Sequence, residues 1–365
     1  MTPRERVEIA LHGGRTDCVP FTMYEGFIVA CEAERRLRNR GMCILHRMDV
    51  IRTHQPNVKV TQHVYWENGK KLVRTFLDTP VGQVTTLTEP SGFTSWTHEK
   101  MFKRPEDYKV LLFLIQDEQY EADYEPFVQK QKLLGGDGLL RAGIGLEPLQ
   151  MMISSHLMSM ETFCEEWMEN RDEILRLYEA IVAQRRKMYP IVAQSPATHA
   201  NYGGNVTPEI IGLENFRKYY LPHYHEAAEI FHRHGKLLGC HFDANCRLLA
   251  GAIAESGLDY IEAFTPAPDT DLTMAEARKA WPKQVLWLNF PSSVHLSSDA
   301  EVEQTAFDLI EQAGKPDGII MGITENIPEH RWQESCHAIM DGLERHVRER
   351  PGLYSKSSSQ RRDAE

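Results

Sequence analysis

Polar side chains occur at or just after the ends of segments whose apolar composition predicts buried strands. In chain order they are Tyr24, Glu25, Asn201, Tyr202, His241, Asp243, Glu262, Asn289, Thr324 and Glu325. If these strands are parallel and close into a barrel, their carboxyl ends meet at one rim, where barrel enzymes carry their catalytic groups. We therefore expect these side chains, which are distant in sequence, to lie together in one site.

The most suggestive spacing is that of His241 and Asp243, two residues apart in an expected strand and its exit. In an extended segment this spacing places both side chains on one face, where they can share a proton or a metal ion. With Glu262 and Glu325 the group contains one imidazole and three carboxylates, a mixed set that suits Zn²⁺, Mn²⁺ or Fe²⁺. Two alternatives stay open. His241 and Asp243 can simply hydrogen-bond each other, and the glutamates can pair with arginines.

Regular alternation of strand-like and helix-like runs positions these residues. Strands are predicted at residues 139–145, 198–202, 236–242, 259–264, 285–290 and 318–323, with helical patterns between them. The later strands are nearly continuous apolar runs, as expected for a parallel sheet buried on both faces. With a first strand at 18–23 and one more element before residue 137, the pattern predicts a (β/α)8 TIM barrel. No glycine-rich phosphate loop follows the first strand, which disfavours a dinucleotide-binding sheet.

The N-terminal third of the chain has a different sequence pattern. Helices are predicted at 1–12, 26–48 and 105–132, whereas residues 58–88 are rich in β-branched residues. Asn68-Gly69 is a strong hairpin signal. We therefore expect an antiparallel hairpin insertion near residues 57–90, within a single barrel domain spanning 1–350. The polar residues 351–365 are expected to form a disordered tail.

The bulk composition limits the classes of function. The chain has 365 residues, a formal net charge of −11 and 42% hydrophobic residues, so it can form a large core and is a poor match for nucleic acid. Its seven cysteines include no CxxC pair, which indicates a reduced, cytoplasmic protein. With no run approaching 18 apolar residues, no membrane span is expected.

The opening residues 4–21, RERVEIALHGGRTDCVPF, resemble the start of proteins of the uroporphyrinogen decarboxylase superfamily, with Cys18 in place of the usual arginine. Further matches are RPEDYKVL at 104–111, the long helical segment at 214–236, the strand into His241 and GITENIPEHRW at 322–332. The resemblance spans the chain to about residue 348. It implies a barrel fold and one of two activities, cofactor-free decarboxylation or corrinoid-dependent methyl transfer.

The resemblance is closer to the corrinoid-dependent methyltransferase branch. The decarboxylase branch carries an arginine-rich loop after the first strand, but this chain has Met23, Tyr24 and Glu25 there, and Glu25 would repel carboxylates. The methyltransferases carry cysteines where Asp243 and Glu325 stand. The resemblance therefore implies a zinc or other divalent metal site with His241, Asp243 and Glu325 as ligands. Glu262 would be a further ligand or an orienting group, and Tyr24, Asn201, Tyr202 and Asn289 would shape the pocket.

Three hypotheses follow from these residues. The first is metal-assisted methyl transfer between a small methoxyl or amine substrate and a corrinoid (methylcobalamin) on a partner protein, or another acceptor. The second is a divergent lyase that decarboxylates a smaller acid and needs a cationic pocket, for which Arg141 and Arg15 are candidates. The third is a barrel that binds a corrinoid or another small ligand without chemistry. A homodimer is expected from the resemblance, and neither nucleic acid nor a membrane is an expected partner.

Overall fold

The structure is a computed structural model and describes residues 1–27, 29–92, 94–154, 156–204 and 206–355. Its contacts divide the chain into two compact units. The barrel unit comprises Met1–Val50, Asp123–Gly145 and Ala193–Glu365, and the insertion unit comprises Ile51–Ala122 and Leu146–Val192. The extent of a single domain over 1–350 stays a prediction.

The barrel unit is built on a closed parallel sheet, as the alternating sequence pattern predicted. In the described residues, eight strands close in the order β1-β14-β13-β12-β11-β10-β9-β2. Their bounds are β1 Phe21–Tyr24, β2 Met42–Arg47, β9 Gly138–Gly143, β10 His199–Tyr202, β11 Leu237–His241, β12 Tyr260–Phe264, β13 Val285–Leu288 and β14 Ile319–Ile323. Every neighbouring pair is parallel. All polar strand ends therefore lie at the same rim.

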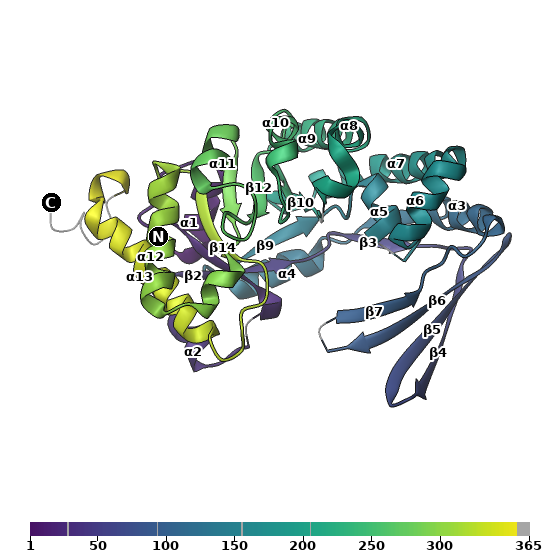
Figure 1. The fold of residues 1–365 in the computed structure, drawn as a ribbon, viewed down its shortest axis with the longest axis horizontal. Coiled ribbons are helices and arrows are strands. Elements are labelled where there is room, and N and C mark those ends of the chain that lie inside the picture. Colours follow the sequence, from purple (N-terminus) through teal and green to yellow (C-terminus); the bar gives the residue numbers. More distant parts are fainter. Residues whose placement is uncertain (28, 93, 155, 205, 356–365) are drawn as a thin grey trace. The chain divides into compact units, whose positions relative to one another are not determined.

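Helices accompany these strands along the barrel unit (Figure 1). They are α1 Pro3–Leu11, α2 Glu32–Arg40, α4 Glu125–Leu134, α8 Pro208–Tyr219, α9 Leu221–Arg233, α10 Ala250–Ala254, α11 Met274–Ala280, α12 Asp299–Ala313 and α13 Trp332–Glu349. Short 3-10 turns are η1 Glu25–Phe27, η3 Arg247–Leu249, η4 Ser292–Leu296 and η5 Pro351–Leu353. Three of these turns, η1, η3 and η4, follow strand ends, so they form part of the rim.

The helix predicted at residues 26–48 was wrong. Residues 26–48 do not form one helix, because Gly41 ends α2 in a left-handed conformation with φ 113°. A side chain there would also meet Arg6, whose Nη1 lies 2.7 Å from the position of a Cβ. The apolar residues that follow then form β2, which pairs with β1 and β9. Strand β2 is the element that the sequence pattern left unassigned.

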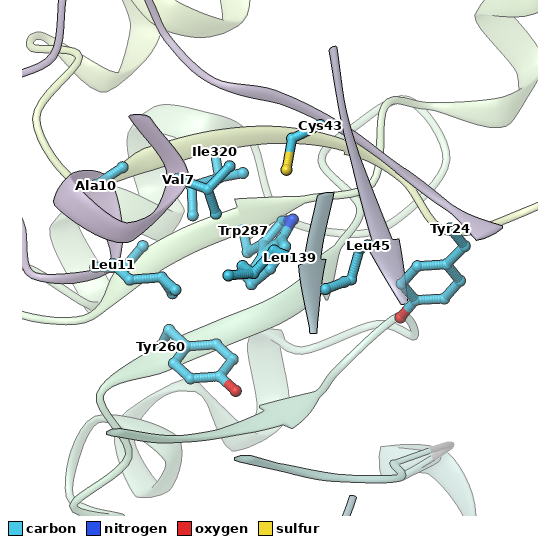
Figure 2. Packing of buried hydrophobic residues seen from close by; sticks show 11 residues of the cluster. Val7, Ala10, Leu11, Tyr24, Cys43, Leu45, Leu139, Tyr260, Trp287 and Ile320 are labelled. Atoms are coloured by element: carbon cyan, nitrogen blue, oxygen red, sulfur yellow. The ribbon is translucent and has the colours of Figure 1, made fainter. Parts of the chain in front are cut away.

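The barrel core is closed at its N-terminal end by helix α1. Val7, Ala10 and Leu11 of this helix belong to one buried cluster with Leu139 and Trp287 from the strands (Figure 2). The indole Nε1 of Trp287 donates to Thr22 Oγ1 at 2.9 Å inside the barrel. A cavity of about 500 Å³ opens at the opposite, polar rim, and a second cavity of about 490 Å³ lies at the α1 end, beside Leu11, Asp259 and Val285.

The insertion unit contains antiparallel sheets, which extend the predicted hairpin. Its four-stranded sheet consists of β4 Lys59–Glu67, β5 Lys70–Thr79, β6 Gly82–Ser91 and β7 Thr94–Glu99. Asn68 and Gly69 have φ of 50° and 77°, as a two-residue hairpin turn requires. A smaller sheet pairs β3 Ile51–His54 with β8 Gln119–Ala122. Strand β8 interrupts the helix predicted for 105–132.

The helices of the insertion unit are α3 Tyr108–Gln116, preceded by the 3-10 turn η2 Pro105–Asp107, and then α5 Pro148–Ser154, α6 Met160–Glu169 and α7 Arg171–Ala193. Across both units, no helix among the described residues is long and apolar enough to cross a membrane. At the C-terminus, the buried hydroxyl of Tyr354 hydrogen-bonds His346 Nδ1 at 2.7 Å. The remainder of the predicted tail, 356–365, lies outside the described residues.

Candidate active site at the C-terminal rim

A polar cavity of about 500 Å³ opens among the carboxyl ends of the barrel strands. Its wall is formed by Tyr24, Arg47, Asp49, Arg141, Ala142, Gly143, Gly145, Asn201, Tyr202, Gly203, His241, Asp243, Thr324 and Glu325. The wall thus includes residues from the N-terminal, central and C-terminal parts of the sequence. This is the convergence that parallel strand ends predict.

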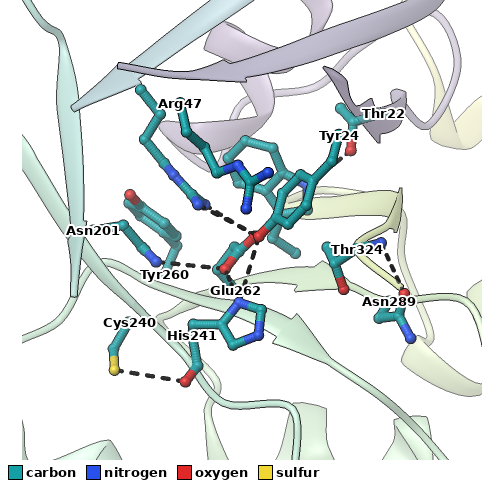
Figure 3. Close-up of polar contacts among 12 residues, drawn as sticks. Thr22, Tyr24, Arg47, Asn201, Cys240, His241, Tyr260, Glu262, Asn289 and Thr324 are labelled. Atoms are coloured by element: carbon teal, nitrogen blue, oxygen red, sulfur yellow. Dashed lines mark hydrogen bonds and ion pairs between the residues drawn. The ribbon is translucent and has the colours of Figure 1, made fainter. Parts of the chain in front are cut away.

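His241 and Glu262 form the centre of the site. They are register partners on the adjacent parallel strands β11 and β12, so their side chains point the same way. The imidazole Nδ1 of His241 lies 2.7 Å from Glu262 Oε2 (Figure 3), and its Nε2 lies 3.3 Å from Asp243 Oδ2. The alternative in which His241 and Asp243 bond each other is therefore observed, with Glu262 as a third member.

The two carboxylates determine the protonation of His241. Each imidazole nitrogen faces a carboxylate oxygen, so both nitrogens are best satisfied as N–H donors. Burial alone would lower the pKa of His241, but Glu262 and Asp243 outweigh burial and raise that pKa to about 10. The side chain is therefore an imidazolium at neutral pH, with Nε2 at the cavity wall.

Glu262 is fully buried and is kept ionised by cationic and hydroxyl partners. Arg141 Nη1 lies 2.9 Å from its Oε1, and the hydroxyl of Tyr24 donates to the same oxygen. Burial alone would raise the pKa of Glu262, but Arg141 and His241 reverse this and hold the pKa well below its usual range. Burial, together with the charge of Glu262, raises the pKa of Tyr24, which therefore stays a neutral donor.

The backbone beside this group is locally strained. Ala263 has φ 58°, and the register between β12 and β13 shifts between Glu262 and Phe264. A left-handed conformation costs a non-glycine residue about 1–2 kcal/mol. Such strain is common at functional sites, and here it accompanies the bulge that directly follows Glu262.

A second backbone feature brings β10 and β11 close together after their ends. Gly204 has φ 82°, and a Cβ at this position would lie 2.0 Å from the carbonyl oxygen of His241. Only glycine fits this approach, because both the conformation and the space exclude a side chain. Gly204 therefore allows the loop after β10 to pack against the backbone that carries the imidazole.

Arg47 and Glu25 form a second ion pair at the end of β2. The two side chains lie 3.4 Å apart, and the Arg47 guanidinium lies 4.1 Å from the centre of the Tyr24 ring. Glu25 does not line the cavity. Glu25 instead balances the charge of Arg47, which lies over the ring of Tyr24. The hydroxyl of this tyrosine donates to Glu262.

Three other predicted residues have distinct positions. Asn201 lines the cavity, and its Nδ2 lies 3.4 Å from Glu262 Oε2. Tyr202 also lines the cavity, but its ring packs edge-on against Tyr224 of α9. Asn289 does not line the cavity, and instead accepts a hydrogen bond from the backbone N–H of Thr324 at 2.9 Å. Asn289 thus positions a wall residue without contacting the open space.

The predicted metal ligands do not converge on one point. His241 and Asp243 lie together, but Glu325 accepts a hydrogen bond from Ser292 at 2.8 Å, and Glu262 is occupied by Arg141 and Tyr24. Among the described residues no group of three or more His, Cys, Asp or Glu could hold a metal ion. A zinc site needs at least three protein ligands, so this donor set does not fit a metal.

Arg47 and Asp49 were not predicted from the sequence, and Arg141 was a candidate only for a decarboxylase. Arg47 was hidden because its strand was predicted as part of a helix. Arg141 carried a usable signal, since a charge within the otherwise apolar run of β9 must find a buried partner. The other candidate cation, Arg15, pairs with Asp317 just before β14 and is therefore at the opposite end of the barrel.

Comparison with known proteins supports the architecture. No protein-family model and no curated protein sequence matches this chain. A solved methyltransferase from Methanosarcina mazei aligns with a TM-score of 0.56 and 11% identity, covering 94% of this chain and 99% of that chain. The fold implied by the sequence resemblance is therefore present in a solved methyltransferase. At this identity the likeness shows the fold alone.

Two further solved structures align at lower scores. The IolI protein with a bound zinc atom has a TM-score of 0.34 and 12% identity over 64% of this chain and 84% of that chain. The pneumococcal virulence factor StrH has a TM-score of 0.37 and 9% identity over 97% and 93% of the two chains. Scores this low support no argument about the site.

Proposed function

We propose that this protein is a methyltransferase that moves a methyl group from a small methoxyl or amine compound to a corrinoid on a partner protein, or to another acceptor. The observation that carries the proposal is the imidazolium of His241, held between Glu262 and Asp243 at the wall of the rim cavity. The sequence resemblance and the fold shared with a solved methyltransferase support the same reaction class.

The imidazolium supplies what methyl transfer from oxygen requires. The bond between the methyl carbon and the oxygen breaks, its electron pair stays on oxygen, and the carbon bonds to an electron pair of the acceptor. The oxygen is a poor leaving group unless it gains a proton. His241 can donate that proton from Nε2, while Glu262 and Arg141 keep the ring oriented through Nδ1. The neutral imidazole then regains a proton from solvent.

The zinc or other divalent ion of the sequence-based hypothesis is not part of this proposal. A metal would activate the methyl donor as a Lewis acid, but the described residues offer no group of three ligands. Proton donation by His241 fills the same chemical need with groups that are in place. The homodimer and the cytoplasmic location stay predictions from sequence.

The test is methylation of free cob(I)alamin by methoxylated compounds and methylated amines. We expect wild-type protein to form methylcobalamin with at least one donor. His241→Gln keeps a polar side chain but cannot be an acid, so transfer from a methoxyl donor should fall by about 10²–10⁴-fold. The matched control is His234→Gln, an exposed histidine that bonds only its own helix among the described residues. Equal rates for wild type and His241→Gln would refute the role of His241.

One observation favours a second candidate, the lyase. Arg47 and Arg141 both line the cavity, as binding of a small carboxylic acid would require. Both guanidinium groups already have carboxylate partners, which weakens their attraction for a further anion. Release of CO₂ from small acids in the same screen, without methyl transfer, would favour the lyase over the methyltransferase.

A further inference from the structure

Strand β4 is a long, uncovered edge of the four-stranded sheet in the insertion unit. The sheet has the order β4-β5-β6-β7, so among the described residues β4 pairs with β5 alone (Figure 1). All nine residues of β4 pair with β5 without a register shift, and none of them is buried or is a proline. The strand therefore lacks the bulges and breaks by which natural sheets protect their edges, and it is a template for a further strand.

The backbone groups of alternate residues in β4 point away from β5. Glu67 and Lys70 flank the two-residue turn of the hairpin, so they form a pair that exchanges backbone hydrogen bonds. Bonded and non-bonded pairs alternate along an antiparallel ladder. Counted from the turn, the residues whose N–H and C=O groups face the open edge are Val60, Gln62, Val64 and Trp66.

The sequence of β4 is complementary to itself in the antiparallel direction. In a symmetric pairing the contact of one residue with another is repeated in reverse across the two-fold axis. If His63 lies on the axis, the edge-facing residues of the two copies are opposite one another, and Lys59 is opposite Glu67 of the second copy. The strands then overlap over their full length. A register centred on Gln62 or Val64 also matches the edge-facing residues, but it shortens the overlap and separates the two charges.

In the register centred on His63, opposite charges alternate across the joined strands. Within one copy Lys59 is the register partner of Asp78, and Glu67 is the partner of Lys70. In the dimer Lys59 also meets Glu67 of the second copy. Each charged side chain at the ends of β4 therefore lies between two side chains of opposite charge, an arrangement that stabilises cross-strand pairs.

The same register covers exposed apolar side chains. Val60, Val64 and Trp66 share one face of β4, because they lie an even number of residues apart, and they are 55%, 56% and 71% exposed. In the dimer Val60 is opposite Trp66 of the second copy. Pairs of an aromatic and a β-branched side chain are favourable across strands, so the contact removes apolar surface that a monomer leaves in water.

We infer that this protein forms a symmetric dimer by antiparallel pairing of β4 with β4 of a second copy, with His63 on the two-fold axis. The pairing forms about eight backbone hydrogen bonds and joins the two four-stranded sheets into one continuous sheet. Because it occupies the β4 edge of both copies, the assembly closes at two chains. The inference assigns a surface to the homodimer expected from the sequence, and it does not depend on the proposed function.

Sedimentation equilibrium of the full chain at about 1–100 µM tests the dimer. We expect wild-type protein to be dimeric at the upper end of this range. Val64→Lys removes an apolar contact and places like charges on both sides of the axis, so it should raise the dissociation constant about tenfold or more. The control is Val81→Lys, the same change at another exposed valine of this sheet, in the turn between β5 and β6. It should leave the dissociation constant unchanged.

Single cysteines test the register. In the proposed dimer His63 meets itself in a non-hydrogen-bonded pair, in which the Cα atoms lie about 4.5 Å apart, a distance that a disulfide spans. Under mild oxidation His63→Cys should form a covalent dimer about tenfold faster than Gln62→Cys or Val64→Cys, which do not meet themselves in this register. Wild-type protein, with its exposed Cys31 and Cys164, gives the background rate.

Several outcomes would overturn the inference. They are a monomer at about 100 µM, a wild-type dissociation constant in Val64→Lys, and equal cross-linking rates in the cysteine variants at 62, 63 and 64. Assemblies larger than a dimer would also overturn it, because a two-fold pairing of β4 leaves no further β4 edge open.

Discussion

Replacing Glu262 by glutamine should be the most damaging conservative change in this protein. The variant removes the negative charge that Arg141 contacts at 2.9 Å and His241 at 2.7 Å. Arg141 is almost completely buried and remains charged, since its pKa is raised by Glu262 and Tyr24 despite the opposing effect of burial. The substitution therefore leaves a cation in the barrel interior without its counter-charge.

The expected cost follows from this burial. Breaking a buried ion pair by removing one partner costs about 3–5 kcal/mol, because the remaining charge has lost its water and its partner. We expect urea denaturation to show a loss of this size in the free energy of unfolding of Glu262→Gln. The double variant Glu262→Gln with Arg141→Met should regain part of the loss, because it removes the stranded charge.

The matched control is Glu255→Gln, which breaks the surface pair between Glu255 and Arg217. That pair has a similar distance of 2.7 Å but is about half exposed on both sides. Solvent screens such a pair, so its loss should cost only a small fraction of the Glu262 effect. Equal losses in the two variants would refute the conclusion that burial makes the Glu262 network important.

Two further predictions concern proton donation and the rim backbone. The raised pKa of His241 means that its charge stabilises the fold fully below about pH 6.5 and that this contribution is lost as pH rises through about 10. The rate of transfer from a methoxyl donor should fall as pH rises through this pKa, which gives the pH–rate profile a high-pH limb. Asp243→Asn should move this limb to lower pH, because it removes one of the two carboxylates that raise the pKa of His241. A limb that does not move would contradict the role of Asp243. Gly204→Ala should lower thermal stability strongly, because its Cβ would meet the His241 carbonyl oxygen. Gly26→Ala, with open space around it, is the control and should have little effect.

The barrel could be predicted because its signal is local and repeated. Each strand after residue 137 is a short apolar run followed by a helical pattern, and only a closed or doubly wound parallel sheet buries such runs on both faces. The failure at 26–48 has an equally local cause. The charged residues of α2 end at Arg40 and the apolar run of β2 begins at Met42, so a single left-handed residue, Gly41, separates helix from strand.

The sequence alone placed most of the polar wall residues at the rim, because the position of a residue at a strand end follows from periodicity, but it missed Arg47 and Asp49, which come from or follow β2. It could not determine how they combine. His241 and Asp243 were recognised as a pair, but Glu262, the other partner of His241, forms an ion pair with Arg141 of β9, three strands away in the barrel. That long-range ion pair keeps Glu262 ionised, and the charges of Glu262 and Asp243 raise the pKa of His241. Only the tertiary structure showed how these side chains pair, because their convergence depends on distances across the barrel that no local pattern encodes.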